Sequence, residues 1–168
     1  APAIYDLKKL NCFNPHYIKE LDLEELKKLT LPFLEEAYDL KDKSSEWINE
    51  LILLHQNYID YGKEIIDATK LFFESDITLE NDAKEFMESD EKINKTIEEF
   101  TKHISDISSW TIENIKEAIN KTKETSGNKG KLLFMPIRIK TTGLMHGPEL
   151  ANTLHLLGKE KVVKRLKG

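Results

Sequence analysis

Cysteine and glycine are scarce in this sequence of 168 residues, and each scarcity excludes a class of site. The single cysteine, Cys12, leaves no intramolecular disulfide framework and no metal site built from several thiolates. Such a chain suits a reducing compartment, so we expect a cytoplasmic location. Seven glycines do not favour an enzyme with a glycine-rich loop around a phosphate. No apolar run approaches the roughly 20 residues that span a bilayer, and residues 1–10 lack the basic and apolar regions of a signal peptide.

The sequence signatures of common enzymes are also missing. There is no Walker loop, no GxGxxG, no HExxH and no GxSxG. The histidines are not spaced as metal ligands, and we interpret them as ordinary surface or core side chains: His16, His55, His103, His146 and His155. Three acid pairs are more typical of solvated helix faces than of catalytic dyads: Glu24-Glu25, Glu35-Glu36 and Glu98-Glu99. These residues predict no catalytic residue and no metal site, and Cys12 is interpreted as a packed thiol.

Charge is unevenly distributed along the chain. The formal net charge is −5, which is not typical of a protein that coats nucleic acid nonspecifically. Residues 127–168, however, hold nine Lys and Arg and two acids, a net of +7. Residues 1–126 hold 16 Lys and Arg and 28 acids, a net of −12. The last quarter of the chain is therefore the part expected to meet phosphates.

Apolar residues recur with the period of an α-helix along most of the chain. One broad stripe consists of Trp47, Leu51, Leu54 and Tyr58, with Ile48, Ile52, His55 and Ile59 beside it. A second stripe consists of Ile93, Ile97, Phe100 and Ile104. Residues 132–139 are the best candidate for a strand, but Pro136 disfavours a central strand. We expect an all-α fold of two packed helical subdomains, divided at the acidic stretch 74–76.

Short-range signals predict where helices begin. Asp22 with Glu25 resembles a capping box, and Ser44 or Ser45 can cap the helix that carries Trp47. Further helix starts are predicted from a cap or a proline at three places: Thr30 before Leu31-Pro32, Ser108-Ser109 before Trp110, and Gly147-Pro148-Glu149.

Two segments near opposite ends of the chain carry a resemblance to a known family. Residues 5–18 read YDLKKLNCFNPHYI, and residues 127–160 contain GNKGKLLFMPIR, TGLMHGPEL and LLGKE. In order and spacing they resemble the C-terminal part of bacterial-type glutamyl-tRNA synthetases, the class I glutamate–tRNA ligases. The corresponding family patterns are FDxxKLxWxNxxY and GxKGxxxxPLRxxxTG. The resemblance covers essentially the whole chain, with Cys12 in place of the family's Trp.

The resemblance implies a fragment that binds the tRNA anticodon. It assigns residues 1–22 to the end of a stem-contact region, 23–76 to a first helical anticodon-binding subdomain and 77–168 to a second. The expected partner is glutamate tRNA, not DNA or a membrane, and the expected state is a monomer. ATP, Mg²⁺, glutamate and the catalytic residues would belong to an absent catalytic domain. On the residues alone, a helical protein–protein interaction domain without RNA binding remains the alternative.

The resemblance also names candidate RNA-binding residues. Arg138 matches the Arg of the PLR segment, and Gly147 and Leu150 match positions that lie against anticodon bases in the family. A guanidinium can stack on a base or form a forked hydrogen bond. The alternatives are a surface ion pair for Arg138 and core packing for Leu150. Lys9 and Asn14 match the first motif, where they would touch the inner side of the tRNA or brace the fold.

One position departs from the family. If Glu64 aligns with the acid of the family pattern RxxTLxE, Tyr58 stands where many members have an Arg that helps monitor the third anticodon base. Tyrosine offers no forked cationic donor, although it can stack. We therefore hypothesise relaxed discrimination, with glutamine tRNA accepted as well. The alternative is that Tyr58, which continues an apolar stripe, packs in the core.

Overall fold

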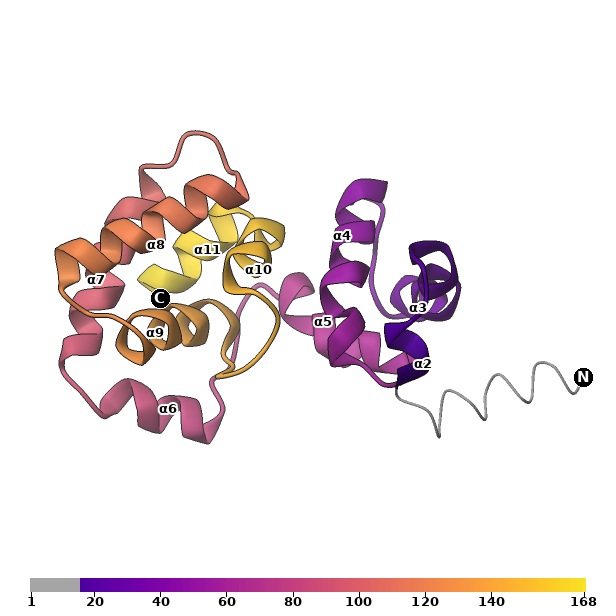
Figure 1. Ribbon diagram of the computed structural model, residues 1–168, viewed down its shortest axis with the longest axis horizontal. Helices are drawn as coiled ribbons and strands as arrows, with labels where there is room; N and C mark the ends of the chain where they lie inside the picture. The colour runs from indigo at the N-terminus through magenta and orange to yellow at the C-terminus, as the bar shows by residue number, and fades with distance from the viewer. Residues whose placement is uncertain (1–15) are drawn as a thin grey trace, which may run out of the picture. The chain divides into compact units, whose positions relative to one another are not determined.

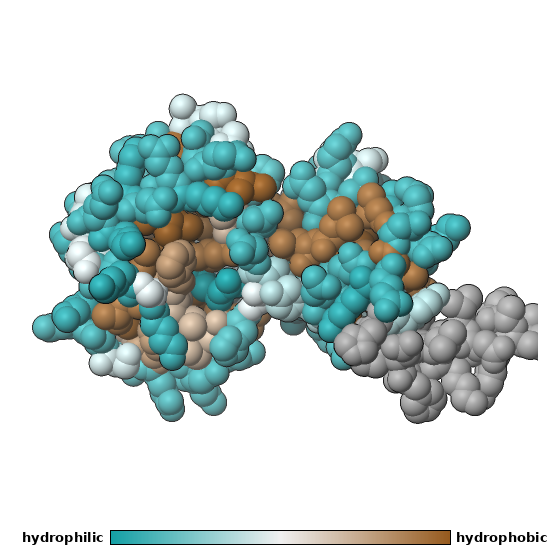
Figure 2. Space-filling model, in the orientation of Figure 1, coloured by the Kyte–Doolittle hydropathy of each residue, from teal (hydrophilic) through white to brown (hydrophobic). Residues whose placement is uncertain are grey.

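The computed structural model describes residues 16–168, and this part of the chain consists of helices joined by loops, without a strand (Figure 1). The prediction of an all-α fold is therefore confirmed. The chain divides into two compact units, Ala1–Phe73 and Glu74–Gly168. Hydrophilic residues cover most of the visible surface of each unit, and apolar patches interrupt this surface (Figure 2). Within residues 16–168, no helix has the length and apolar character needed to cross a membrane.

The first unit is built around helices α3, α4 and α5 (Figure 1). Its elements are α2 (His16–Lys19), α3 (Leu23–Ala37), α4 (Ser45–His55), the 3₁₀ turns η1 (Gln56–Tyr58) and η2 (Gly62–Glu64), and α5 (Ile65–Phe73). Its core consists of aliphatic side chains from these elements: Ile18, Leu26, Leu34, Ile52, Ile59 and Ile65.

Helix α3 begins at the predicted cap and continues past a second predicted helix start. The carboxylate of Asp22 accepts a hydrogen bond of 2.9 Å from the backbone N–H of Glu25. The predicted helix start at Thr30 is wrong, because α3 continues through Pro32 without interruption. Thr30 is buried inside the helix and donates its hydroxyl proton to the carbonyl of Leu26 at 2.8 Å. Apolar burial on both sides of Pro32 outweighs the one helical hydrogen bond that proline removes.

Helix α4 ends before the apolar stripe of the sequence ends. Ser44 caps it by accepting a hydrogen bond of 3.1 Å from the N–H of Trp47, as predicted. The helix stops at His55, and Tyr58 lies in the following 3₁₀ turn. The change of helical geometry rotates Tyr58 out of the stripe, and its side chain is 55% exposed. The alternative interpretation, that Tyr58 packs in the core, is therefore wrong.

Aromatic side chains join α4 and α5 to the end of α3. The rings of Tyr38 and Phe73 are stacked, with centroids 4.1 Å apart. Trp47 meets Phe73 edge-on at 5.7 Å, and the Tyr38 hydroxyl donates a hydrogen bond of 2.7 Å to the carbonyl of Ile66. Offset and edge-on ring pairs stabilise a core beyond the area that they bury.

The second unit is a bundle in which α7 packs against α8, α9 and α11 (Figure 1). Its helices are α6 (Asn81–Glu88), α7 (Lys92–Ser105), α8 (Ile112–Ser126), α9 (Lys131–Thr142), α10 (Leu150–Leu157) and α11 (Lys159–Lys167). Its core contains Ile93, Phe100, Ile104, Ile115, Leu133, Ile137, Leu154 and Val162.

Helix α9 contains Pro136, and the rest of the bundle compensates for it. Proline has no N–H, so the carbonyl of Leu132, four residues earlier, lacks its usual helical donor. The hydroxyl of Thr96 on α7 donates to this carbonyl at 2.8 Å. The Asn128 side-chain amide then donates to the Thr96 hydroxyl at 2.8 Å and to the carbonyl of Lys92 at 2.8 Å. The candidate strand at 132–139 is therefore a helix whose missing hydrogen bond comes from another helix.

Two further helix starts differ from the prediction. Helix α8 is capped by Thr111, which accepts from the N–H of Asn114 at 3.1 Å, and not by Ser108-Ser109. Trp110 stays outside the helix, where its indole N–H donates to the carbonyl of His155 at 3.1 Å. Helix α10 begins at Leu150, so the predicted start at 147–149 lies in the preceding loop.

Arg165 is a buried cation that connects three segments of the second unit. Its side chain is 6% exposed, and Nη1 donates to the carbonyl of Thr141 at 2.7 Å. Nη2 donates to the carbonyl of Glu74 at 2.8 Å. Burial lowers the pKa of Arg165, and the nearby carboxylates of Glu74 and Asp76 oppose that shift. One of the nine basic residues of the last quarter is thus part of the core and cannot meet phosphates.

His55 is a buried titratable side chain of the first unit. It is 2% exposed, and its Nδ1–H donates to the carbonyl of Leu51 at 2.7 Å. Burial lowers the pKa of His55 below the usual 6.5, although this hydrogen bond partly opposes the shift. Below pH 6.5 the unfolded chain therefore binds more protons than the folded chain. The contribution of neutral His55 to the stability of the folded chain is fully present above pH 6.5. It is lost as the pH falls through the lowered pKa of His55 in the folded state.

We expect the free energy of unfolding of the chain to fall more between about pH 7.5 and about pH 5 than that of His55→Gln. Glutamine does not titrate, so the difference between the two proteins isolates His55 from the surface carboxylates. Urea denaturation at both pH values measures it. Equal losses in the two proteins would contradict the assignment.

Candidate functional site

Arg138 lies against the loop that joins α9 to α10. Its Nη1 donates a hydrogen bond of 3.0 Å to the carbonyl of Pro148. Gly147 packs beside it, because a Cβ at that position would lie 3.2 Å from Nη1. The guanidinium is half-buried and is oriented by the backbone of the loop. The structure thus brings together Arg138 and Gly147, which the sequence places nine residues apart.

Leu150 belongs to the same region but is turned inward. It is the first residue of α10, and its side chain is 7% exposed. This burial agrees with the core-packing alternative, so the surface next to Arg138 is formed by the loop rather than by the Leu150 side chain. Contact of Leu150 with RNA remains a prediction.

Gly143 sets the direction in which the loop leaves α9. It has a left-handed backbone, with φ of 80°, and its N–H donates to the carbonyl of Ile139 at 2.8 Å. A Cβ at this position would lie 2.8 Å from the carbonyl oxygen of Thr78. Thr142 adds a second fixed point, because its hydroxyl bonds the carbonyl of Arg138 at 2.7 Å and accepts from the N–H of Leu144 at 3.2 Å.

The basic residues of the last quarter divide into structural and exposed groups. Lys159 donates to the carbonyl of Ile107 at 2.6 Å, and Lys140 to that of Gly168 at 2.7 Å. Together with Arg165, these cations bond backbone carbonyls of the protein. The exposed cations are Lys129, Lys131, Lys164 and Lys167. The charge available to an anionic partner is therefore smaller than the net charge of the segment.

Tyr58 lines a depression in the first unit. Its volume is about 500 Å³, and it is lined by Tyr58, Tyr61, Lys63, Glu64, Ile66, Asp67 and Ala68. Tyr58 and Tyr61 are 55% and 46% exposed. The Glu64 carboxylate accepts from the backbone N–H groups of Asp60 at 2.8 Å and Tyr61 at 3.3 Å, which fixes the turn that presents the rings. Sequence reasoning missed Tyr61, because its position depends on this turn and not on helical spacing.

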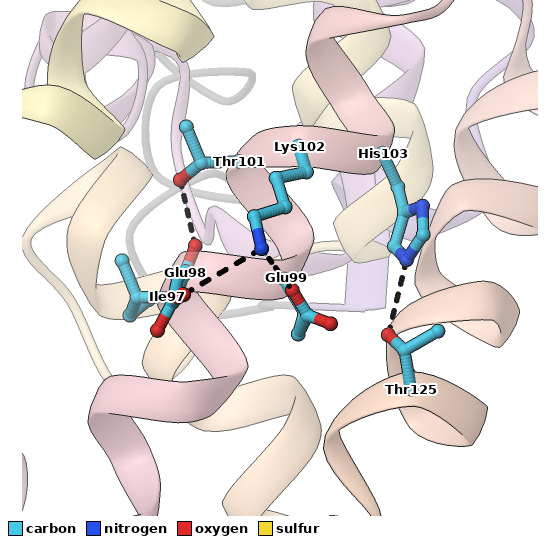
Figure 3. A network of polar contacts seen from close by, with 7 residues as sticks. All are labelled: Ile97, Glu98, Glu99, Thr101, Lys102, His103 and Thr125. Carbon is cyan, nitrogen blue, oxygen red and sulfur yellow. Dashed lines mark hydrogen bonds and ion pairs between the residues drawn. The ribbon is translucent and has the colours of Figure 1, made fainter.

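The acid pair Glu98-Glu99 on α7 forms ion pairs with Lys102 (Figure 3). The Lys102 ammonium lies 3.5 Å from the Glu98 carboxylate and 3.1 Å from that of Glu99. The hydrogen bond from Lys102 lowers the pKa of Glu99 and raises that of Lys102. Glu98 and Lys102 are exposed, as the interpretation of a solvated helix face predicts, whereas the Glu99 side chain is only 12% exposed. Nearby, His103 Nε2 lies 3.0 Å from the hydroxyl of Thr125 on α8.

Other candidate residues lie outside this site or outside the described residues. Lys9, Asn14 and Cys12 precede residue 16, where the described structure begins, so the roles of Lys9 and Asn14 stay predictions. Between residues 16 and 168, no three His, Cys, Asp or Glu side chains are grouped as a metal site requires.

Comparison with known proteins identifies a family and relatives. Residues 25–168 match the family described as "Anticodon binding domain". The chain is 40% identical to a glutamate–tRNA ligase of Bacillus licheniformis over 170 residues, covering 99% of this chain and 35% of that protein. A glutamate–tRNA ligase of Geobacillus stearothermophilus is similar to the same extent, with 40% identity over 170 residues. The chain spans about a third of the length of these curated relatives.

Solved structures show the same architecture. A glutamate tRNA ligase from Elizabethkingia meningosepticum, crystallised with its amino acid, superposes with a TM-score of 0.78 at 25% identity. The match covers 95% of this chain and 31% of that structure. A glutamate–tRNA synthetase from Elizabethkingia anophelis superposes with a TM-score of 0.75, and at 24% identity it shows a shared fold alone.

We expect Gly143→Ala to destabilise the chain by about 2–4 kcal/mol, because it adds both a left-handed alanine and a backbone clash. Gly127→Ala is the matched control. Gly127 ends α8 with a φ of 76°, but a Cβ there meets nothing within 4 Å. Gly127→Ala is expected to lower the free energy of unfolding by about 1–2 kcal/mol. Urea denaturation of both variants measures the difference, and equal losses would show that Thr78 does not confine the loop.

Proposed function

Because the chain belongs to the anticodon binding domain family, we propose that it recognises the anticodon loop of glutamate tRNA within a larger glutamate–tRNA ligase. The remaining two thirds of such an enzyme would carry the ATP-dependent attachment of glutamate, together with the sites for ATP, glutamate and Mg²⁺. Recognition by this chain would hold the tRNA so that its distant acceptor end reaches those sites. A cytoplasmic, monomeric enzyme is the expected setting.

The observation that supports RNA recognition most strongly is the fixed guanidinium of Arg138. An anticodon loop is single-stranded, so its bases can be unstacked and read on their edges. A planar cation can stack on such a base or form a forked hydrogen bond with it. The bond from Nη1 to the carbonyl of Pro148 restricts the orientation of Arg138 before RNA binds. A preorganised side chain loses less conformational entropy on binding than a mobile one.

Electrostatics supports selective binding over nonspecific binding. The exposed lysines Lys129 and Lys131 precede and begin α9, the helix that carries Arg138. They can attract phosphates, whereas the net charge of −12 in residues 1–126 discourages binding of arbitrary RNA. Affinity would therefore depend on salt, and specificity on a few oriented groups.

Tyr58 supports a relaxed choice of tRNA. Its ring is exposed in the depression that it shares with Tyr61, so it is available for stacking on a base. Stacking tolerates every base, because each has a π-face. A tyrosine in place of the family's arginine would thus contact the third anticodon base without distinguishing glutamate tRNA from glutamine tRNA.

We expect the 168-residue chain to bind a glutamate tRNA transcript more tightly than an unrelated tRNA, with an affinity that falls as salt rises. Arg138→Ala should weaken binding roughly 10- to 100-fold. Arg138→Lys keeps the charge but lacks the planar fork, so this variant should also bind glutamate tRNA weakly. A filter-binding or calorimetric titration at two salt concentrations measures both effects. Absence of salt-dependent binding to any of the tRNAs would instead favour a helical protein–protein interaction domain.

We also expect a glutamine tRNA transcript to bind with an affinity comparable to that of glutamate tRNA. Tyr58→Arg should lower the affinity for glutamine tRNA relative to glutamate tRNA, because a forked donor discriminates between bases. The same titration measures this ratio, with Tyr61→Arg as the control for added charge in the depression. Strong rejection of glutamine tRNA by the unmodified chain would contradict the hypothesis.

A further inference from the structure

Phe134 is a large apolar side chain that α9 leaves 49% exposed. It lies four residues before Arg138 and three after Lys131, and residues at these spacings share one face of a helix. The other face of α9 is buried through Leu133, Pro136, Ile137 and Ile139. A single exposed apolar residue is common and needs no special function. What distinguishes Phe134 is its place between two cations, on a helix that accepts hydrogen bonds from α7 and α11.

The charge around Phe134 favours an anionic partner. Residues 127–148, which include the loop before α9, all of α9 and most of the loop after it, contain no Asp or Glu, and the exposed Glu149 ends the second loop. Lys129 and Lys131 are exposed in this segment, and Arg138 is oriented by Pro148. A protein partner that docked on Phe134 would need acidic side chains to pair with these cations. A nucleic acid supplies phosphates for the cations and a planar apolar face for the ring.

We infer that Phe134 is a stacking platform for an unpaired base of the anticodon loop, next to the base that Arg138 contacts. This assignment rests on the proposed function. Four residues of α-helix separate the two side chains by about 6 Å along the axis, a distance that neighbouring bases can bridge when they are splayed apart. Stacking requires only the exposed ring of Phe134.

Hydrogen bonds from two other helices hold α9, and with it Phe134, in place. The Thr96 hydroxyl bonds the carbonyl of Leu132 at 2.8 Å, two residues before Phe134. Arg165 bonds the carbonyl of Thr141 at 2.7 Å near the other end of α9. The ring is therefore presented by a helix anchored at both ends, so its contact with a base requires little reorganisation of the backbone.

The test measures binding of the 168-residue chain to a hairpin RNA with the anticodon stem and loop of glutamate tRNA. Phe134→Ala should weaken binding roughly 5- to 100-fold, whereas Phe134→Tyr should bind like the unmodified chain. Phe134→Leu is the matched control, because it stays apolar but cannot stack and should lose most of the affinity. The salt dependence should be unchanged in Phe134→Ala but shallower in Lys131→Ala, which removes a phosphate contact. Circular dichroism and thermal melting confirm that each variant folds.

Hairpins in which each loop nucleotide in turn lacks its base identify the stacked position. For one such hairpin, Phe134→Ala and the unmodified chain should bind equally, because the ring has no base to meet. A penalty that persists for every hairpin, or no penalty at all, would overturn the stacking assignment. Failure of the unmodified chain to bind the intact hairpin would overturn the proposed function together with this assignment, so the two failures are distinguishable.

Discussion

The second unit depends on the buried guanidinium of Arg165. It donates to the carbonyls of Thr141 and Glu74, which lie 24 and 91 residues away in the chain. Carbonyls in the last turn of a helix lack helical donors, so Arg165 satisfies an end of α9 that would otherwise be buried without a partner. Gly143, two residues after Thr141, then turns the chain into the loop that meets Arg138. The orientation of the candidate RNA-binding cation thus depends on a cation in the core.

Helix α9 illustrates how a bundle can accommodate a residue that opposes local structure. Pro136 removes one hydrogen bond from the middle of the helix, and Thr96 on α7 supplies the donor that the Leu132 carbonyl lacks. Asn128 holds the Thr96 hydroxyl in place by donating to it. The same network fixes α9 against α7, so the compensation for proline also anchors the helix that presents Phe134 and Arg138.

Some cations of the last quarter stabilise the fold, and others are exposed to a partner. Arg165, Lys140 and Lys159 bond carbonyls of the protein itself, which leaves a few exposed lysines and the half-buried Arg138 for an anionic partner. A surface with few oriented groups suits reading of unpaired bases, where direction matters more than total charge. In the proposed function, the acidic first three quarters of the chain would complement this arrangement, because they would limit binding to RNA that makes the specific contacts.

Local interactions let the sequence by itself determine the helical character and the caps at Asp22 and Ser44. Its motifs predicted the family, which the comparisons confirm, and named Arg138 as a candidate RNA-binding residue. Each cap joins residues three apart, so it can be read within one turn of helix. Tertiary structure alone decided that α3 passes through Pro32, that α8 starts at Thr111, that Tyr58 is exposed and that Arg165 is buried. These outcomes depend on hydrogen bonds and apolar contacts between residues far apart in the chain, whose free energy exceeds the local preferences. The spacing of residues within a few positions of one another cannot predict such distant partners.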